Sequence, residues 1–259
     1  MSDREILGEG SFARVYRDGD KAIKEFDELG QYIIRETSAI LGVSGNCFRP
    51  NEGKSYLLDV KPLEYSFSMK RFSDNLQGKI FTPPVAKYII YRVLLQLYEA
   101  HKMSIIHADI KSNNILINSL PEKETFHFER YDPILADWGI SQFPFIPGFS
   151  PSYRIQTINY RAPEVFLGLE YDFKIDIWSM GILYLELLGL IDFEFKFEIV
   201  DNGIAHEIKI DNNSSLVEYI AYLYGPIPDS WHQGQQKFAL ECESVESYSL
   251  AISNYLFSH

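Results

Sequence analysis

The chain has 259 residues, of which 46% are apolar, and a formal net charge of −12. This length and composition allow one large domain or two small lobes around a sizeable core. The 36 acidic residues outnumber the 24 basic ones, which disfavours nucleic-acid binding through phosphates and leaves room for a basic protein or peptide partner.

The predicted elements divide the chain into two parts. Up to about residue 70, short runs of alternating apolar and polar residues are separated by glycines, which predicts a β-rich region with one helix near residues 31–41. From Pro83 onward an amphipathic helix begins and helical patterns dominate. We therefore expect an α+β protein with a small β-rich N-lobe (about 1–70), a hinge (about 70–76) and a larger helical C-lobe (about 77–259), with a ligand cleft between the lobes.

Two features of the predicted N-lobe suit phosphate binding. Gly8 and Gly10 lie in a strand–turn–strand pattern where the backbone can approach phosphates closely, although this pattern taken alone favours a plain hairpin. Lys24 alternates with apolar neighbours on the next strand, and Glu36 follows in the helical run. A lysine and a glutamate buried together would need each other, whereas a lone strand lysine is usually solvated.

The stretch "SIIHADIKSNNILIN" (Ser104 to Asn118) places a polar cluster between two apolar runs. Asp109 and Lys111 alternate, so on an extended loop they point the same way. A carboxylate can accept a hydroxyl proton, a lysine can stabilise a phosphate in transfer, and the Asn114 amide oxygen can bind Mg²⁺. The alternative is an Asx-rich turn, which leaves the lysine unexplained.

Two later motifs complete the pattern. Asp137 follows an apolar strand and precedes Trp138–Gly139, which suits a hard cation, although a simple turn is the alternative. Ala162–Pro163–Glu164 comes next, followed by Asp176, for which helix capping is the alternative.

With these motifs in this order and at this spacing, the chain resembles a eukaryotic protein kinase. The signature set of that family is a Gly-rich loop, a strand lysine, a helix glutamate, HRD…N, DFG and APE. The corresponding segments here are GEGSFA, AIK, Glu36, HADIKSNN, DWG and APE. The resemblance covers nearly the whole chain and implies one kinase domain over residues 1–259.

The resemblance implies a role for each matched residue. In the catalytic set, Asp109 would be the base and Lys111 would contact the γ-phosphate. Lys24 and Glu36 would form the pair that holds the α/β-phosphates. Thr157 would be the activation-segment threonine that contacts Asp109 and Lys111 and favours Ser/Thr substrates. Asn114 and Asp137 would hold Mg²⁺. The ATP-binding set comprises Leu7, Gly8, Glu9, Gly10, Val15, Ala22, Lys24, Met69 and Leu116, with residues 70–72 as the hinge.

The segments "YRAPE", "LG-x-x-Y" and "DIWS-x-G" resemble the CMGC group of protein kinases. Within it, "HADIK" and "IQT…YRAPE" are most similar to the SR-protein and pre-mRNA-processing kinases, whereas "DWG" is similar to the casein kinase two family. The implied activity is ATP-dependent phosphorylation of protein serines and threonines. The acidic charge predicts basic, Arg-rich protein substrates, and we expect a monomer that does not bind nucleic acid.

The chain departs from the family pattern at two places. Ala108 replaces the HRD arginine that in many kinases helps to bind an activation-loop phosphate. We therefore predict activity that does not need activation-loop phosphorylation. No arginine follows Arg161 to pair with Glu164, which leaves Lys237 as a substitute without the bidentate fork. The alternative function is a pseudokinase or scaffold. A small-molecule phosphotransferase is disfavoured by the APE segment and Thr157.

The cysteine content and hydropathy indicate a location. Cys47 and Cys242 cannot make a disulfide framework, so we expect an intracellular protein, cytoplasmic and/or nuclear. The segment "MSDREILGEG" lacks the apolar core of a signal peptide. The longest apolar stretch, Met180 to Ile191, is too short to span a bilayer. We therefore expect no membrane association.

Overall fold

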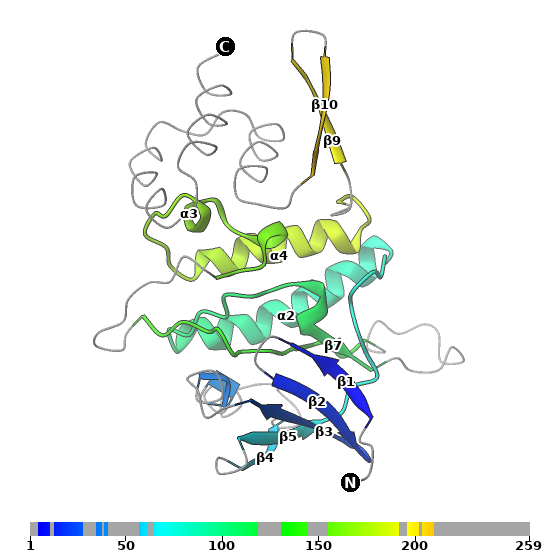
Figure 1. Cartoon of the computed structure of the whole chain (residues 1–259), viewed down its shortest axis with the longest axis vertical. Coiled ribbons are helices and arrows are strands. Elements are labelled where there is room, and N and C mark those ends of the chain that lie inside the picture. Colours follow the sequence, from blue (N-terminus) through cyan, green and yellow to red (C-terminus); the bar gives the residue numbers. More distant parts are fainter. Residues whose placement is uncertain are drawn as a thin grey trace.

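The computed structural model of the chain describes residues 5–10, 13–27, 35–37, 39–40, 57–61, 65–118, 131–144, 155–191, 196–201 and 204–209. These residues form a β-rich lobe and a helical lobe, which lie one above the other in Figure 1. The expectation of an α+β, two-lobed fold is confirmed. The assignment of residues 1–259 to a single domain, with Lys237 inside it, stays a prediction because many of these residues lie outside the described ranges.

The N-lobe sheet contains five antiparallel strands in the order β1-β2-β3-β5-β4. The strands are β1 (Ile6–Glu9), β2 (Ala13–Asp18), β3 (Lys21–Phe26), β4 (Leu57–Lys61) and β5 (Ser66–Lys70). Gly19 adopts φ +57° in the tight turn between β2 and β3, a conformation that glycine reaches without steric cost. Residues 35–37 and 39–40 are helical, as expected. The pairing of β3 with β5 sets Ala22 opposite Met69.

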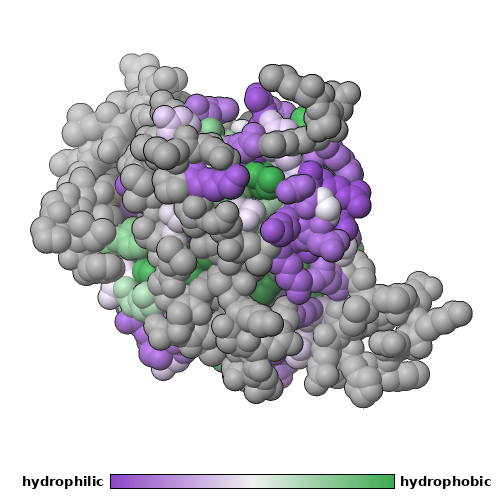
Figure 2. Space-filling model, turned by 90° about the horizontal axis from the view of Figure 1, so that it is seen from below, coloured by the Kyte–Doolittle hydropathy of each residue, from purple (hydrophilic) through white to green (hydrophobic). Residues whose placement is uncertain are grey.

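The surface of the N-lobe side is mainly polar. Viewed from below in Figure 2, hydrophilic residues predominate on the described part of this face, and hydrophobic residues show only as small patches between them. Exposed ion pairs join neighbouring strands of the N-lobe sheet, for example Arg14 with Glu9 at 2.8 Å.

The C-lobe is built around two helices, α2 (Pro83–Lys102) and α4 (Lys174–Leu187), which lie one above the other in Figure 1. Helix α2 begins at Pro83, where the missing N–H of proline costs nothing. It buries a stripe that includes Ile89, Val93, Leu97 and Ala100, as its spacing predicted. The short α3 (Pro163–Phe166) and the 3₁₀ turn η5 (Ile158–Tyr160) precede α4.

A small sheet carries the polar loop, residues 107–114, between the lobes. Its strands are β6 (Asp74–Asn75), β7 (Ile115–Ile117) and β8 (Ile134–Leu135), and the 3₁₀ turn η2 (Ser112–Asn114) leads into β7. The main core cluster is continuous from Phe67 of the N-lobe sheet to Leu97 of α2 and Trp138 beyond β8. This continuous core fixes the small sheet relative to both lobes.

Beyond residue 83 the structure contains the expected helices and also one element that the sequence pattern did not predict. The strands β9 (Lys196–Asp201) and β10 (Ile204–Lys209) form an antiparallel hairpin. An Asn-Gly pair at 202–203, a strong hairpin signal between β-prone runs, was overlooked in the sequence. Among the described residues, the structure contains no helix that is both long and apolar enough to cross a bilayer.

Candidate active site

A cleft of about 830 Å³ opens between the N-lobe sheet and the small sheet. The structure brings every predicted site residue to its lining. These are the nucleotide set Leu7, Gly8, Glu9, Gly10, Val15, Ala22, Lys24, Met69 and Leu116, the catalytic set Glu36, Asp109, Lys111 and Thr157, and the metal set Asn114 and Asp137. Their roles stay predictions, but their common location does not depend on those roles.

Lys24 on β3 is the centre of a three-membered ionic cluster. Its ammonium donates to both carboxylate oxygens of Glu36, at 2.9 and 2.7 Å, and to Asp137 Oδ1 at 2.7 Å. The Lys24 and Glu36 side chains are only 13% and 3% exposed, so neither charge is held by water. The cluster therefore ties the N-lobe sheet and the helical residue Glu36 to the end of the small sheet.

Burial and charge act against each other in this cluster. Burial acts to lower the pKa of Lys24, but the attraction of Glu36 and Asp137 outweighs it and raises that pKa. Burial raises the pKa of Glu36 to about 7, although Lys24 acts to lower it. Enclosure in the cleft acts to raise the pKa of Asp137, but Lys24 outweighs it and lowers the pKa, so this carboxylate stays ionised.

The backbone of the polar loop is oriented by His107, which is fully buried. The Asp109 N–H donates to His107 Nδ1 at 3.2 Å, and His107 Nε2 lies 3.0 Å from the Ala136 carbonyl oxygen. The neutral tautomer with its hydrogen on Nε2 satisfies both contacts, and burial lowers the pKa of His107. His107 thus fixes Asp109 without contributing a charge.

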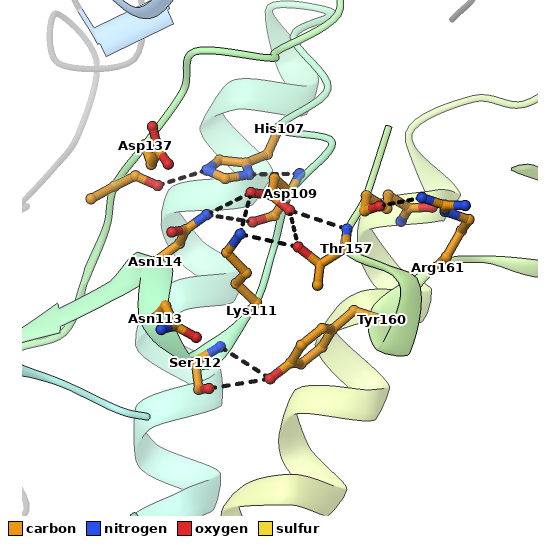
Figure 3. Close-up of polar contacts among 12 residues, drawn as sticks. His107, Asp109, Lys111, Ser112, Asn113, Asn114, Asp137, Thr157, Tyr160 and Arg161 are labelled. Atoms are coloured by element: carbon orange, nitrogen blue, oxygen red, sulfur yellow. Dashed lines mark hydrogen bonds and ion pairs between the residues drawn. The ribbon is translucent and has the colours of Figure 1, made fainter. Parts of the chain in front are cut away.

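Asp109, Lys111 and Thr157 form a closed set of hydrogen bonds, drawn in Figure 3. Thr157 Oγ1 donates to Asp109 Oδ1 at 2.8 Å and accepts from Lys111 Nζ at 3.0 Å. Lys111 Nζ also lies 2.8 Å from Asp109 Oδ2. The carboxylate is therefore held on both oxygens, with an ammonium beside it, at the edge of the cleft.

Asn114 and Asp137 have the chemistry of a magnesium site. Asn114 Nδ2 donates to the Asp109 backbone oxygen at 2.8 Å and to Asp109 Oδ2 at 3.1 Å, so its amide oxygen is the atom left for a cation. Mg²⁺ is commonly held by one or two protein oxygens together with substrate phosphates and waters.

Asp176 of α4 has a role that the sequence interpretation missed. Phe173, not Asp176, is the N-cap of α4. The fully buried Asp176 carboxylate accepts from the backbone N–H groups of His107 and Ala108, at 2.8 and 2.9 Å, and lies 2.9 Å from His101 Nε2. It fixes the polar loop from the side of α4.

We expect the substitution Asp176→Ala to lower the free energy of unfolding by about 3 kcal/mol, because it leaves two buried N–H groups without an acceptor. Asp20→Ala is the matched control, since the exposed Asp20 side chain forms no hydrogen bond or ion pair with the described residues and its loss should change stability by less than about 0.5 kcal/mol. Urea denaturation followed by circular dichroism measures both. Equal midpoints for the two variants would contradict this role.

Other lining residues were also missed. Asp74 and Asn75 of β6 and Asn113 of η2 line the cleft beside the predicted sites. Trp138 is fully buried, its indole N–H donates to the Leu135 carbonyl at 3.1 Å, and its ring packs edge-on against His107 at 4.5 Å. Two signals were present in the sequence: Asp74 and Asn75 are polar residues within the expected hinge, and Asn113 belongs to the polar cluster between Ser104 and Asn118.

The sequence of the chain is similar to those of known protein kinases. The sequence model of the protein kinase domain matches residues 62–245. The chain is 32% identical over 202 residues to the serine/threonine-protein kinase pakH of Dictyostelium discoideum, an alignment that covers 71% of this chain and 36% of that protein. It is 30% identical over 206 residues to the cell division control protein 2 homolog 3 of Trypanosoma brucei brucei, with 71% and 60% covered. The matches thus span less than two thirds of either relative's length.

Solved structures agree on the fold. A chain of the CAK complex of Chaetomium thermophilum bound to ATP-gamma-S superposes with a TM-score of 0.65 at 20% identity, covering 96% of this chain and 79% of that chain. At this identity the likeness concerns the fold alone. Because the family model matches well over half of the residues, the chain belongs to the protein kinase domain family.

Proposed function

We propose that this chain is a serine/threonine protein kinase that transfers the γ-phosphate of Mg-ATP to protein hydroxyls. The observation that carries the proposal is the closed set formed by Asp109, Lys111 and Thr157 at the edge of the cleft that Lys24 and Asp137 also line. The family match and the similarity to the serine/threonine-protein kinase pakH support it.

In the proposed reaction, Asp109 accepts the proton of the attacking hydroxyl. The hydroxyl oxygen forms a bond to the γ-phosphorus while the bond to the β–γ bridging oxygen breaks, and ADP leaves. Lys111 stabilises the charge on the phosphoryl group in transfer, and Lys24, held by Glu36, binds the α- and β-phosphates. Asn114 and Asp137 would hold Mg²⁺, which neutralises phosphate charge when bound.

We further propose a CMGC-like kinase, and the identity to a cell division control protein 2 homolog supports this group. Neither curated relative favours the SR-protein or the casein kinase two families within it. The net charge of −12 supports basic, Arg-rich substrates, and we propose a monomer. Phosphorylation of a degenerate Ser/Thr/Tyr peptide array tests the proposed substrate preference. Labelling of serine and threonine in basic peptides is expected, and tyrosine labelling would overturn the assignment to the serine/threonine kinases.

The alternative, a pseudokinase or scaffold, has one observation in its favour. Glu164 forms no ion pair with the described residues, and burial raises its pKa. Lys237, the predicted substitute partner, lies outside the described ranges. Nucleotide binding without transfer to any peptide on the array would favour this alternative.

The environment of Ala108 supports activity without activation-loop phosphorylation. Its side chain is fully buried in an apolar cluster with Ile106, Ile155, Ala162, Val165 and Ile175. Its backbone, at φ +68°, donates to Asp176 and accepts from the Gln156 N–H at 2.8 Å. Apolar packing and main-chain bonds thus join the polar loop to residues 155–165 where other kinases use an arginine and a phosphate.

We therefore expect phosphatase treatment of the purified protein to change kcat/KM by less than about twofold, because no arginine at position 108 is available to bind an activation-loop phosphate. Mass spectrometry confirms removal of phosphate, and initial-rate assays before and after treatment measure the change. A collapse to background after treatment would overturn the prediction, provided that mock-treated enzyme keeps its rate.

A further inference from the structure

The buried residue Gln156 lies directly before Thr157 and has no role in the mechanism above. It is 4% exposed and adopts φ +61°, a left-handed conformation that non-glycine residues rarely keep unless their surroundings hold them. Ala108 and Asp137, the other two such residues that line or adjoin the cleft, also belong to segments held by several bonds.

The side chain of Gln156 connects its segment to α4. Nε2 donates to the Ile175 backbone oxygen at 2.9 Å and to Ser179 Oγ at 2.8 Å, and Oε1 accepts from the Ala162 N–H at 3.0 Å. Ser179 Oγ in turn donates to the Tyr160 backbone oxygen at 2.7 Å. The amide therefore uses both of its hydrogens and its oxygen inside the protein.

The peptide group between Gln156 and Thr157 is held at both ends. Its carbonyl oxygen accepts from Arg161 Nη2 at 2.9 Å, and its N–H donates to Asp109 Oδ1 at 3.2 Å. The orientation of this one peptide group thus determines where Thr157 meets Asp109 and Lys111. A rotation about the Gln156 φ angle would move Thr157 away from both.

We propose that Gln156 is a positioning residue, a latch that fixes Thr157 over Asp109 and Lys111 through α4 and without a phosphate. The inference rests on the proposed kinase activity and identifies how that site is kept assembled. The latch consists of Gln156, Ile175, Ser179 and Ala162, which all lie within the described residues. It acts together with the apolar cluster around Ala108, which packs against the same segment and whose Ala108 carbonyl oxygen accepts from the Gln156 N–H at 2.8 Å.

The test compares Gln156→Met with Gln96→Met. Gln96 of α2 is 3% exposed and makes the same set of side-chain bonds, two donated by Nε2 to Arg92 and Pro133 and one accepted from the Leu135 N–H. Both variants lose a buried amide of equal size, so both should lose a similar amount of thermal stability. Only Gln156→Met removes the bonds that orient Thr157.

The first readout is steady-state kinetics on a peptide that the array identifies as a substrate. The assay temperature is well below the melting temperatures of both variants. We expect Gln156→Met to lower kcat at least about tenfold and to raise the peptide KM, with the ATP dissociation constant unchanged, because a small displacement of reacting groups costs rate rather than nucleotide affinity. Gln96→Met should change neither parameter by more than about twofold. Equal kinetic losses in the two variants would overturn the latch.

Hydrogen exchange read by mass spectrometry gives a second readout that needs no activity. We expect faster exchange of the amides in residues 155–162 in Gln156→Met, and not in Gln96→Met. Unchanged exchange there would sink the inference even if kcat fell. If the wild type phosphorylated no peptide, the proposed function would fail, and the exchange comparison would still decide whether Gln156 holds the segment.

A milder variant covers the case in which Gln156→Met does not fold. Ser179→Ala removes one acceptor of Gln156 and the bond to the Tyr160 backbone oxygen, and leaves the Ile175 and Ala162 bonds in place. The same directions of change, at smaller size, are expected in kinetics and exchange. A Ser179→Ala enzyme with wild-type exchange and wild-type kcat would also overturn the latch.

Discussion

Asp109→Asn should lower the turnover of peptide phosphorylation by roughly 100- to 10,000-fold, the range that a positioned general base contributes. Asparagine has nearly the same shape and can still accept the Thr157 bonds, but it does not take a proton from the attacking hydroxyl. ATP affinity should stay within about twofold, because Asp109 contacts Thr157, Lys111 and Asn114 and not the nucleotide set.

The measurement is kcat on a saturating peptide together with titration calorimetry of nucleotide binding. Asp172→Asn, an exposed carboxylate outside the cleft, is the matched control and should behave as the wild type. Turnover of Asp109→Asn equal to that of the control would refute the assigned base. A parallel loss of ATP affinity would instead indicate that the loop had rearranged.

Lys24→Met should abolish measurable phosphoryl transfer and lower the free energy of unfolding by about 3 kcal/mol, the size expected when one partner of a buried ion pair is removed. Glu36 and Asp137 would lose the cation that each contacts at 2.7 Å. Burial already raises the pKa of Glu36 to about 7, so in the variant we expect Glu36 to become protonated at neutral pH, which limits the loss of stability.

Lys21→Met on the same strand is the control, because Lys21 is exposed and lies outside the cleft lining. Thermal unfolding with and without Mg-ATP measures both effects: wild type and Lys21→Met should gain stability from the nucleotide, and Lys24→Met should gain little. A Lys24→Met protein with the stability and nucleotide response of the control would contradict the proposed role of the ionic cluster.

Local patterns in the sequence predicted much of the fold. The alternation in β1 to β3, the helix that starts at Pro83 and the polar loop between two apolar runs each depend on residues close in sequence. The β9–β10 hairpin was missed although its Asn-Gly signal is also local.

The supports of the site were harder to predict because they join residues far apart in the chain. Asp176 binds the backbone of His107 and Ala108, 69 and 68 residues earlier. Gln156 connects to Ser179, 23 residues later. From the sequence alone, an aspartate at a helix start indicates capping and a glutamine in a loop indicates nothing. Only the packing of α4 against the loop gives them these partners.

The interpretation of Ala108 also depends on the packing of α4 against the polar loop. In the sequence it is a missing arginine, an observation that fits a decayed enzyme as well as an unregulated one. In the structure Ala108 is fully buried in an apolar cluster, and its backbone forms hydrogen bonds with both Asp176 and Gln156. A position held in this way supports an assembled site more than a decayed one.

Transfer of labelled γ-phosphate from Mg-ATP to a Ser/Thr peptide library by the fully dephosphorylated chain tests the central claim most directly. We predict incorporation into serine and threonine that continues over many turnovers and is lost in Asp109→Asn. Nucleotide binding by the dephosphorylated wild type, with transfer no greater than that of Asp109→Asn, would contradict the claim and identify the chain as a pseudokinase.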